Sequence, residues 1–207
     1  MLSQIHDVAG ALTLLREHRV VTVTPCGSLP SIVRQVVGGP VKGSWWGHPD
    51  GKLIFRICSA LAEHDEALAV KLVDGKITFV YRTLWPALLR VVTDPKWRKG
   101  ARASLGEMAQ KLFTQVEKEG ELHLVAVGGN LKPDRRAALR NAKLELERSL
   151  LVLSTSEHTP AGKHESVLVS WRRWAKKARA SRAAGSFADA LAEIQRASQN
   201  RPTALDV

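Results

Sequence analysis

Apolar and polar positions in the first part of the chain change their spacing several times. Residues 8–18 (VAGALTLLREH) place apolar side chains at helical spacing, whereas residues 19–24 (RVVTVT) are β-branched and short, as in a strand. Residues 28–37 predict a second helix, because Pro30 suits a first helical turn and Gly38-Gly39-Pro40 ends the apolar pattern. Residues 50–64 predict a third helix. We therefore expect the order helix, strand, helix, helix.

The next stretch, from Ala67 to Tyr81, predicts a β-hairpin. Two alternating apolar runs, 67–73 and 76–81, flank the dipeptide Asp74-Gly75. An Asp-Gly pair favours a tight hairpin turn, because both central positions of that turn need a positive φ. The first unit should therefore end as strand, turn, strand.

The same series of elements is expected a second time further along the chain. Apolar spacing there predicts a helix, a strand, one long or two short helices, and two strands around a polar loop. The corresponding residues are 105–118, 121–127, 133–150, 151–155 and 166–171. A separate second helix is poorly marked in this copy.

Composition shifts divide the chain into three expected parts. A helix over 82–92 follows the hairpin, and the basic segment Lys96–Gly100, flanked by breakers, is the best candidate boundary. The residues after Trp171 predict helices interrupted at Gly185-Ser186. We expect a unit with a trailing helix at 1–94, a second unit at 95–170, and a basic helical C-terminal extension at 171–207.

The order of elements resembles the winged-helix superfamily, a variant of the helix-turn-helix DNA readers. The resemblance lies in topology alone, since no diagnostic motif supports it. It implies an α+β fold with two tandem winged-helix-like units followed by the basic helical extension.

Charge narrows the class of partner. Thirty-one Lys and Arg against twenty Asp and Glu give a net charge of +11 and a sequence pI near 10.1. Such an excess attracts polyanions and gains from counterion release. Nucleic acid, most of all DNA, is the first candidate; an anionic membrane surface is the second, and a ribosomal or merely highly soluble protein is the third. Apolar runs are far shorter than a membrane span requires and the N-terminus lacks a secretory pattern, so we expect no membrane partner and a cytoplasmic location.

Basic side chains recur along the predicted helix at 133–150. Arg136, Arg140 and Lys143 follow at i, i+4 and i+7, beside an apolar stripe. The resemblance implies that this helix enters the major groove, where Arg136 and Arg140 would read bases and lysines would contact phosphates. An ordinary solvated basic face is the alternative. The full set of candidate nucleic-acid contacts is Lys52, Arg56, Arg135, Arg136, Arg140, Lys143, Lys163, Arg172, Arg173, Lys176 and Lys177.

The loop SWWGHPD, from Ser44 to Asp50, is the most unusual local sequence. Adjacent indoles at Trp45 and Trp46 could stack on a base or line a pocket, with His48 adding acid–base capacity. The alternative is that one or both tryptophans fill the core beneath the third helix, which Asp50 would start.

Enzymatic chemistry is not decided by these residues. No glycine-rich phosphate loop, GxSxG or HExxH motif occurs, and we expect neither a metal nor a cofactor. Of the two cysteines, Cys58 is expected on the apolar side of its helix, and Cys26 is expected to be more exposed.

The sequence predicts a protein that binds double-stranded DNA. Two alternatives stay open: a nucleic-acid-processing enzyme of base-modification or repair type that uses the Trp-Trp-Gly-His-Pro loop, and a winged-helix protein–protein scaffold.

Overall fold

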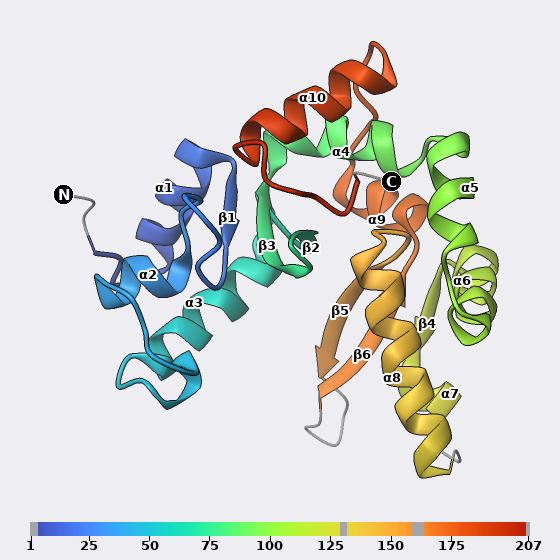
Figure 1. The fold of residues 1–207 in the computed structure, drawn as a ribbon, viewed down its shortest axis with the longest axis horizontal. Helices are drawn as coiled ribbons and strands as arrows, with labels where there is room; N and C mark the ends of the chain where they lie inside the picture. The colour runs from blue at the N-terminus through green and yellow to red at the C-terminus, as the bar shows by residue number, and fades with distance from the viewer. Residues whose placement is uncertain (1–3, 129–131, 159–163, 206–207) are drawn as a thin grey trace.

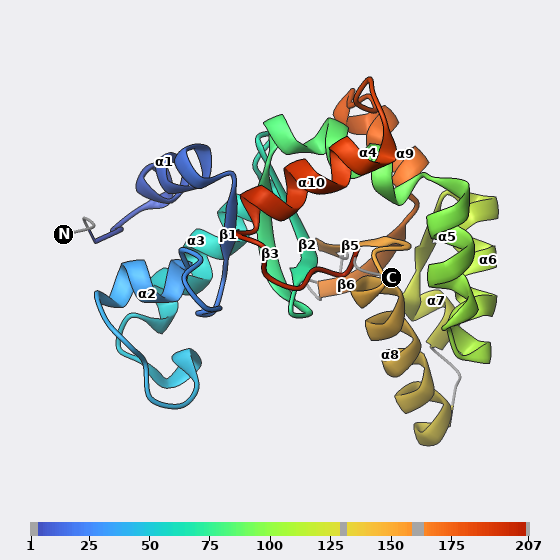
Figure 2. The same ribbon diagram turned by 45° about the horizontal axis from the view of Figure 1, so that its top comes forward.

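The computed structural model describes residues 4–128, 132–158 and 164–205. Within them, helices surround two three-stranded antiparallel sheets, which confirms the predicted α+β class. The N-terminal helices lie at one end of the molecule and the second sheet lies toward the other end (Figure 1; Figure 2). The first sheet lies between them.

The first unit has the predicted order of elements. Its elements are α1 (Val8–His18), β1 (Val20–Thr22), α2 (Ile32–Val37), the 3₁₀ turn η1 (Trp45–Gly47), α3 (Gly51–Glu63), β2 (Ala67–Val73) and β3 (Lys76–Tyr81). The strand order is β1-β3-β2. Asp74 and Gly75 have φ values of 49° and 65°, so the hairpin turn is of the primed type that the sequence predicted. Helix α2 begins later than predicted, because Ser31 caps it by accepting a hydrogen bond from the Arg34 N–H.

Side chains cover both faces of the first sheet. Val21 and Phe79 belong to one buried cluster with α1, α2 and α3. Their chain neighbours Val20 and Val80 belong to a second cluster, which includes residues of α4, α8 and α10. Alternation along the strands sends successive side chains to opposite faces. The first sheet therefore connects the N-terminal helices to the rest of the protein.

The connection between the two units is helical. It consists of the 3₁₀ turn η2 (Arg82–Leu84), α4 (Trp85–Val92) and α5 (Pro95–Ala103). Asp94 caps α5, since its Oδ1 accepts hydrogen bonds from the Lys96 and Trp97 N–H groups at 2.9 and 3.1 Å. Residues 96–100 therefore lie within a helix, because Pro95 stands at the first helical position, where proline is tolerated. The domain boundary expected at Lys96–Gly100 stays a prediction.

The second unit repeats the order of the first. Its elements are α6 (Glu107–Glu119), β4 (Glu121–His123), α7 (Leu124–Gly128), α8 (Pro133–Arg148), β5 (Leu153–His158) and β6 (His164–Val169). The strand order is β4-β6-β5, which corresponds to β1-β3-β2. The strand predicted at 121–127 is wrong in its second half, where the apolar run forms α7. That helix takes the position of the poorly marked second helix.

The C-terminal extension contains α9 (Trp171–Ala178) and α10 (Phe187–Ala197). Ser186 and Asp189 form the predicted capping box of α10. Helix α10 lies along α4 in both views (Figure 1; Figure 2). The residues after α10 then follow the first hairpin, where the Asp74 N–H donates to the Pro202 carbonyl and the Ala204 N–H donates to the Leu72 carbonyl. The extension therefore packs on the first unit.

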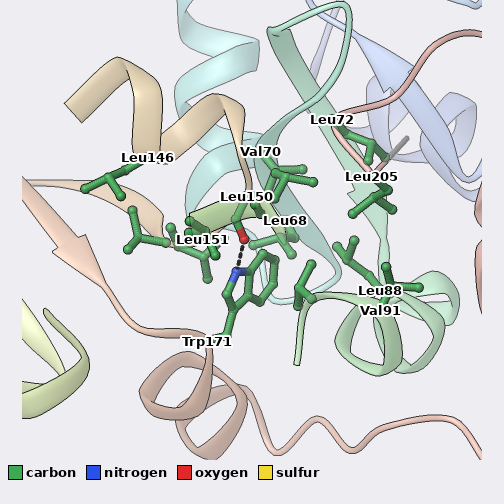
Figure 3. Packing of buried hydrophobic residues seen from close by; sticks show 14 of the residues in the cluster. Leu68, Val70, Leu72, Leu88, Val91, Leu146, Leu150, Leu151, Trp171 and Leu205 are labelled. Carbon is green, nitrogen blue, oxygen red and sulfur yellow. Dashed lines mark hydrogen bonds between the residues drawn. The ribbon is translucent and has the colours of Figure 1, made fainter. Parts of the chain in front are cut away.

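Trp171 occupies the core that joins these parts. Its side chain is 1% exposed, and its Nε1–H donates to the Leu150 carbonyl at 2.6 Å (Figure 3). The surrounding cluster draws residues from β2, α4, α8 and the C-terminal segment, among them Leu68, Leu88, Leu146 and Leu205. All three expected parts share this core, and their boundaries stay predictions.

The cysteines differ in their surroundings. Cys58 lies on the partly buried side of α3, and burial raises the pKa of its thiol to about 12. Cys26 is buried, so its expected exposure is wrong. Its thiol donates to Asp74 Oδ2 at 2.9 Å, and Arg201 contacts the same carboxylate oxygen at 3.0 Å. Cys26 is thus enclosed by the hairpin and the C-terminal segment.

Candidate nucleic-acid interface

Helix α8 has a buried stripe and an exposed basic side. Leu139, Ala142 and Leu146 are buried, and α8 packs against α6. The side chains of Arg135, Arg136 and Arg140 are exposed in the N-terminal half of the helix. Arg135 and Arg140 have no hydrogen bond or ion pair with the described residues, whereas Arg136 makes a contact inside the protein. The two free arginines can therefore reach an external anion.

Lys143 does not extend freely from this basic side. Its Nζ donates to Ser166 Oγ at 3.1 Å and lies 3.5 Å from Glu147 Oε1. Glu147 also binds Lys71 of β2, with 2.9 Å between Nζ and Oε2. The two lysines and Glu147 thus connect α8 to both hairpins, so Lys143 lies in an internal network.

The basic residues of α9 are mostly exposed. The side chains of Arg172, Lys176 and Lys177 make no hydrogen bond or ion pair with the described residues. Arg173 is instead bound to Glu121 at the start of β4, at 2.6 Å between Nη2 and Oε1. Both views place α9 far from the N-terminal end of α8 (Figure 1; Figure 2). The basic residues of α8 and α9 therefore do not form one cluster.

Helix α3 occupies the position in the first unit that α8 occupies in the second. Lys52 and Arg56 are exposed on it, as expected, and have no hydrogen bond or ion pair with described residues. Phe55 lies between them in the sequence and is 48% exposed. A large apolar side chain on the outer side of this helix was missed at the sequence level. The helical spacing could have revealed it, since Ile54, Ile57 and Leu61 already define the inward stripe.

The tryptophan loop divides its two indoles between core and surface. Trp45 is partly buried against the cluster of the first unit, whereas Trp46 is 63% exposed. The two rings stack with centroids 4.2 Å apart and an interplanar angle of 22°. Trp46 also lies 5.5 Å from the Phe55 ring, at 43°. Trp45 thus packs against the core, as one alternative expected, whereas the Trp46 indole is exposed.

His48 organises the turn that precedes α3. Its ring Nδ1 accepts a hydrogen bond from the Asp50 N–H at 3.2 Å, and the backbone N–H of His48 donates to the Trp45 carbonyl at 3.1 Å. Asp50 is the N-cap residue of α3, as predicted, although its side chain caps no N–H group. Nδ1 of His48 is therefore occupied by the Asp50 N–H within the loop.

Two cavities in the described part of the chain lie away from the tryptophan loop. One cavity, of about 130 Å³, lies between the first hairpin and the α8–β5 connection. Its lining residues include Lys71, Ile77 and Leu150. The other, of about 700 Å³, lies between the α5–α6 connection and α8. Neither is lined by Trp45, Trp46 or His48. The aromatic residues therefore form an exposed surface away from both cavities.

Some candidate chemistry lies outside the described residues or is not assembled among them. Lys163 lies outside the described residues. Among those that the structure describes, no three His, Cys, Asp or Glu side chains gather as metal ligands would. None of the described helices combines the length and the apolar character that a membrane span requires.

Comparison with protein-family models, with curated proteins and with solved structures gives no match for this chain.

Proposed function

We propose that the protein binds double-stranded DNA through two winged-helix units, with α8 as the main contact helix. The repeated element order and the shared strand order support the winged-helix assignment of both units. Helix α8 follows the shorter helix α7 and precedes the hairpin. In winged-helix proteins, the helix at this position reads DNA. A cytoplasmic location belongs to this proposal.

The exposed arginines of α8 are the observation on which the proposal rests. Arg135 and Arg140 are free of internal partners among the described residues and lie in the N-terminal half of the helix, which has the positive end of the helix dipole. An arginine can bind a phosphate or both acceptors of guanine through two parallel hydrogen bonds. The net charge of +11 adds long-range attraction to a polyanion.

Not every predicted contact residue has the same part in this proposal. Lys143 and Arg173 are occupied by Glu147 and Glu121, so we assign them to the internal structure. Arg172, Lys176 and Lys177 remain candidates for phosphate contacts at a second place on the DNA.

The test is a pair of matched double variants. R135A/R140A removes two charges from α8, and K96A/K118A removes two exposed charges from α5 and α6. Arg136 stays in place because of its internal contact. Fluorescence anisotropy with a labelled duplex should show weaker binding by R135A/R140A, by about tenfold or more. The slope of log Kobs against log salt should fall by up to about one unit for each lost phosphate contact.

The control variant should bind more like the wild type, because its lysines lie on other helices. Circular dichroism and thermal melting establish that both variants fold. Equal affinities and slopes for R135A/R140A and the wild type would contradict the assignment of α8. Absence of duplex binding by the wild type at low salt would contradict DNA binding itself.

A further inference from the structure

We propose that Trp46 and Phe55 form a stacking surface for an unpaired nucleotide base. This inference rests on the proposed DNA binding and adds a class of target to it, namely DNA in which a base is unpaired. The two rings lie 5.5 Å apart and are among the most exposed large apolar side chains in the described part of the chain. Base–aromatic stacking tolerates any sequence, because every base has a π face.

The surrounding turn fixes the Trp46 backbone. The Ser44 side chain accepts a hydrogen bond from the Trp46 N–H, and the Gly51 N–H donates to the His48 carbonyl at 2.8 Å. A Cβ atom at Gly51 would lie 2.9 Å from the Trp45 carbonyl oxygen and 3.0 Å from that of Trp46. The turn thus packs directly on the first turn of α3, and only glycine fits there. Because the backbone at Trp46 is already fixed, less conformational entropy is lost when a ligand binds to it.

Trp45 supports the exposed indole from behind. It packs on the core of the first unit, and its ring stacks on that of Trp46. Most of the Trp46 side chain still contacts solvent. A flat aromatic group can therefore add to a stack that the protein has already begun.

The charges beside the rings suit a nucleotide. Lys52 and Arg56 lie one helical turn apart on α3, next to Phe55, and both are exposed. The first turn of α3 contains no acidic residue, and the carboxylate of its N-cap residue, Asp50, lies 3.5 Å from His48 Nδ1. A nucleotide has both a base for the rings and a phosphate for these cations. A second copy of this chain is a poor occupant, since two molecules with a net charge of +11 repel each other.

An unpaired base fits this surface better than a paired one. Within a duplex, neighbouring base pairs cover the faces of each base. A protein that stacks on a base must therefore bind a single strand or a base outside the helix. The α8 arginines would hold the paired part of such a target, and α3 would hold the unpaired base.

The test compares three labelled DNA probes: a fully paired duplex, the same duplex with one extra unpaired nucleotide, and the corresponding single strand. Wild-type protein should prefer the two probes with unpaired bases. W46A should bind the duplex with the extra nucleotide about 5- to 150-fold more weakly than the wild type, the range expected for one stacked base. Its affinity for the paired duplex should change little. Trp46 is exposed, so the variant is expected to fold, which circular dichroism checks.

Two further variants separate stacking from apolar contact. W46F keeps an aromatic ring and should retain most of the preference, whereas W46L keeps apolar surface without a π face and should behave like W46A. Equal losses on paired and unpaired probes, or wild-type behaviour of W46L, would overturn the inference. So would a change in self-association of W46A, measured by sedimentation, with DNA binding unchanged.

Outcomes for the wild type distinguish this inference from the proposed function. Binding of the paired duplex without any preference for unpaired probes would overturn the stacking surface and leave DNA binding standing. Failure to bind all three probes at low salt would overturn both.

Discussion

Helices α3 and α8 hold the same place in two copies of one element order, yet their outer surfaces differ. Helix α8 exposes arginines in its N-terminal half. Helix α3 exposes Phe55 between Lys52 and Arg56, with Trp46 beside it. A repeated order of elements therefore preserves the positions of helices without preserving their chemistry. We assign phosphate and base-pair contacts to α8 and an unpaired base to α3.

The first hairpin is enclosed by the rest of the protein. Both faces of the β2–β3 hairpin are covered, and the C-terminal segment binds its turn. Its two lysines are occupied as well, since Lys71 binds Glu147 and Lys76 donates to the Pro25 carbonyl at 2.7 Å. This hairpin is thus a structural element between the two units. The first unit can contact a ligand through α3 and its loop, but not through the tip of this hairpin.

The largest expected effect concerns the core that both units share. W171A removes an indole that is 1% exposed and leaves the Leu150 carbonyl without its 2.6 Å hydrogen bond. We expect a loss of about 3–5 kcal/mol in the free energy of unfolding, the usual range for a large aromatic residue removed from a core. Chemical denaturation measures it. A loss below about 1 kcal/mol would contradict the central place of Trp171.

A smaller effect, with a defined pH dependence, is expected at the turn of the first hairpin. The pKa of Asp74 lies below its ordinary value because the Cys26 thiol donates a hydrogen bond to it and Arg201 lies beside it. A lowered pKa in the folded state stabilises the protein above the ordinary pKa of the carboxyl group, about 3.9, and this contribution is lost as pH falls through the folded value.

D74N removes this charge without changing the shape of the side chain, and asparagine tolerates the positive φ of this position. The variant should be less stable than the wild type at neutral pH, and the two should converge as pH falls below about 4. Thermal melting over a pH series measures the difference. A difference in melting temperature between D74N and the wild type that stays constant down to acid pH would show that the Asp74 charge contributes nothing to stability.

Local signals in the sequence were sufficient for α1 and for the first hairpin. The bounds of α1, β2 and β3 agree with the predicted ranges, because helical spacing and the Asp-Gly turn act over a few residues. The apolar run at 121–127 fits a strand and a buried helix equally well, so its division into β4 and α7 was missed. Helix α5 was missed because Asp94-Pro95 was taken as a break, although both residues also suit a helix start.

The candidate interface was predicted in part. Exposure of Arg136 and Arg140 agrees with their predicted position beside the apolar stripe of α8. Arg135 lies one turn before Leu139, the first buried residue of the helix, and is exposed as well. The internal contacts of Lys143 and Arg173 depend on Ser166, Glu147 and Glu121. Two of these partners, Ser166 and Glu121, lie on strands distant in the chain, and such tertiary contacts leave no periodic signal in the sequence. The pairing of Trp46 with Phe55 joins a loop to a helix for the same reason.

Cross-linking from α8 to bound duplex tests the central claim most directly. Cys26 is buried and the pKa of Cys58 is raised to about 12, so a cysteine placed at an exposed position is the most reactive thiol in the chain. R140C and K118C, each labelled with a thiol-attached benzophenone, present the same photoreactive group on α8 and on α6. Illumination with duplex DNA should cross-link the R140C protein efficiently and the K118C protein little. Equal yields, or a higher yield from K118C, would contradict α8 as the DNA-binding helix.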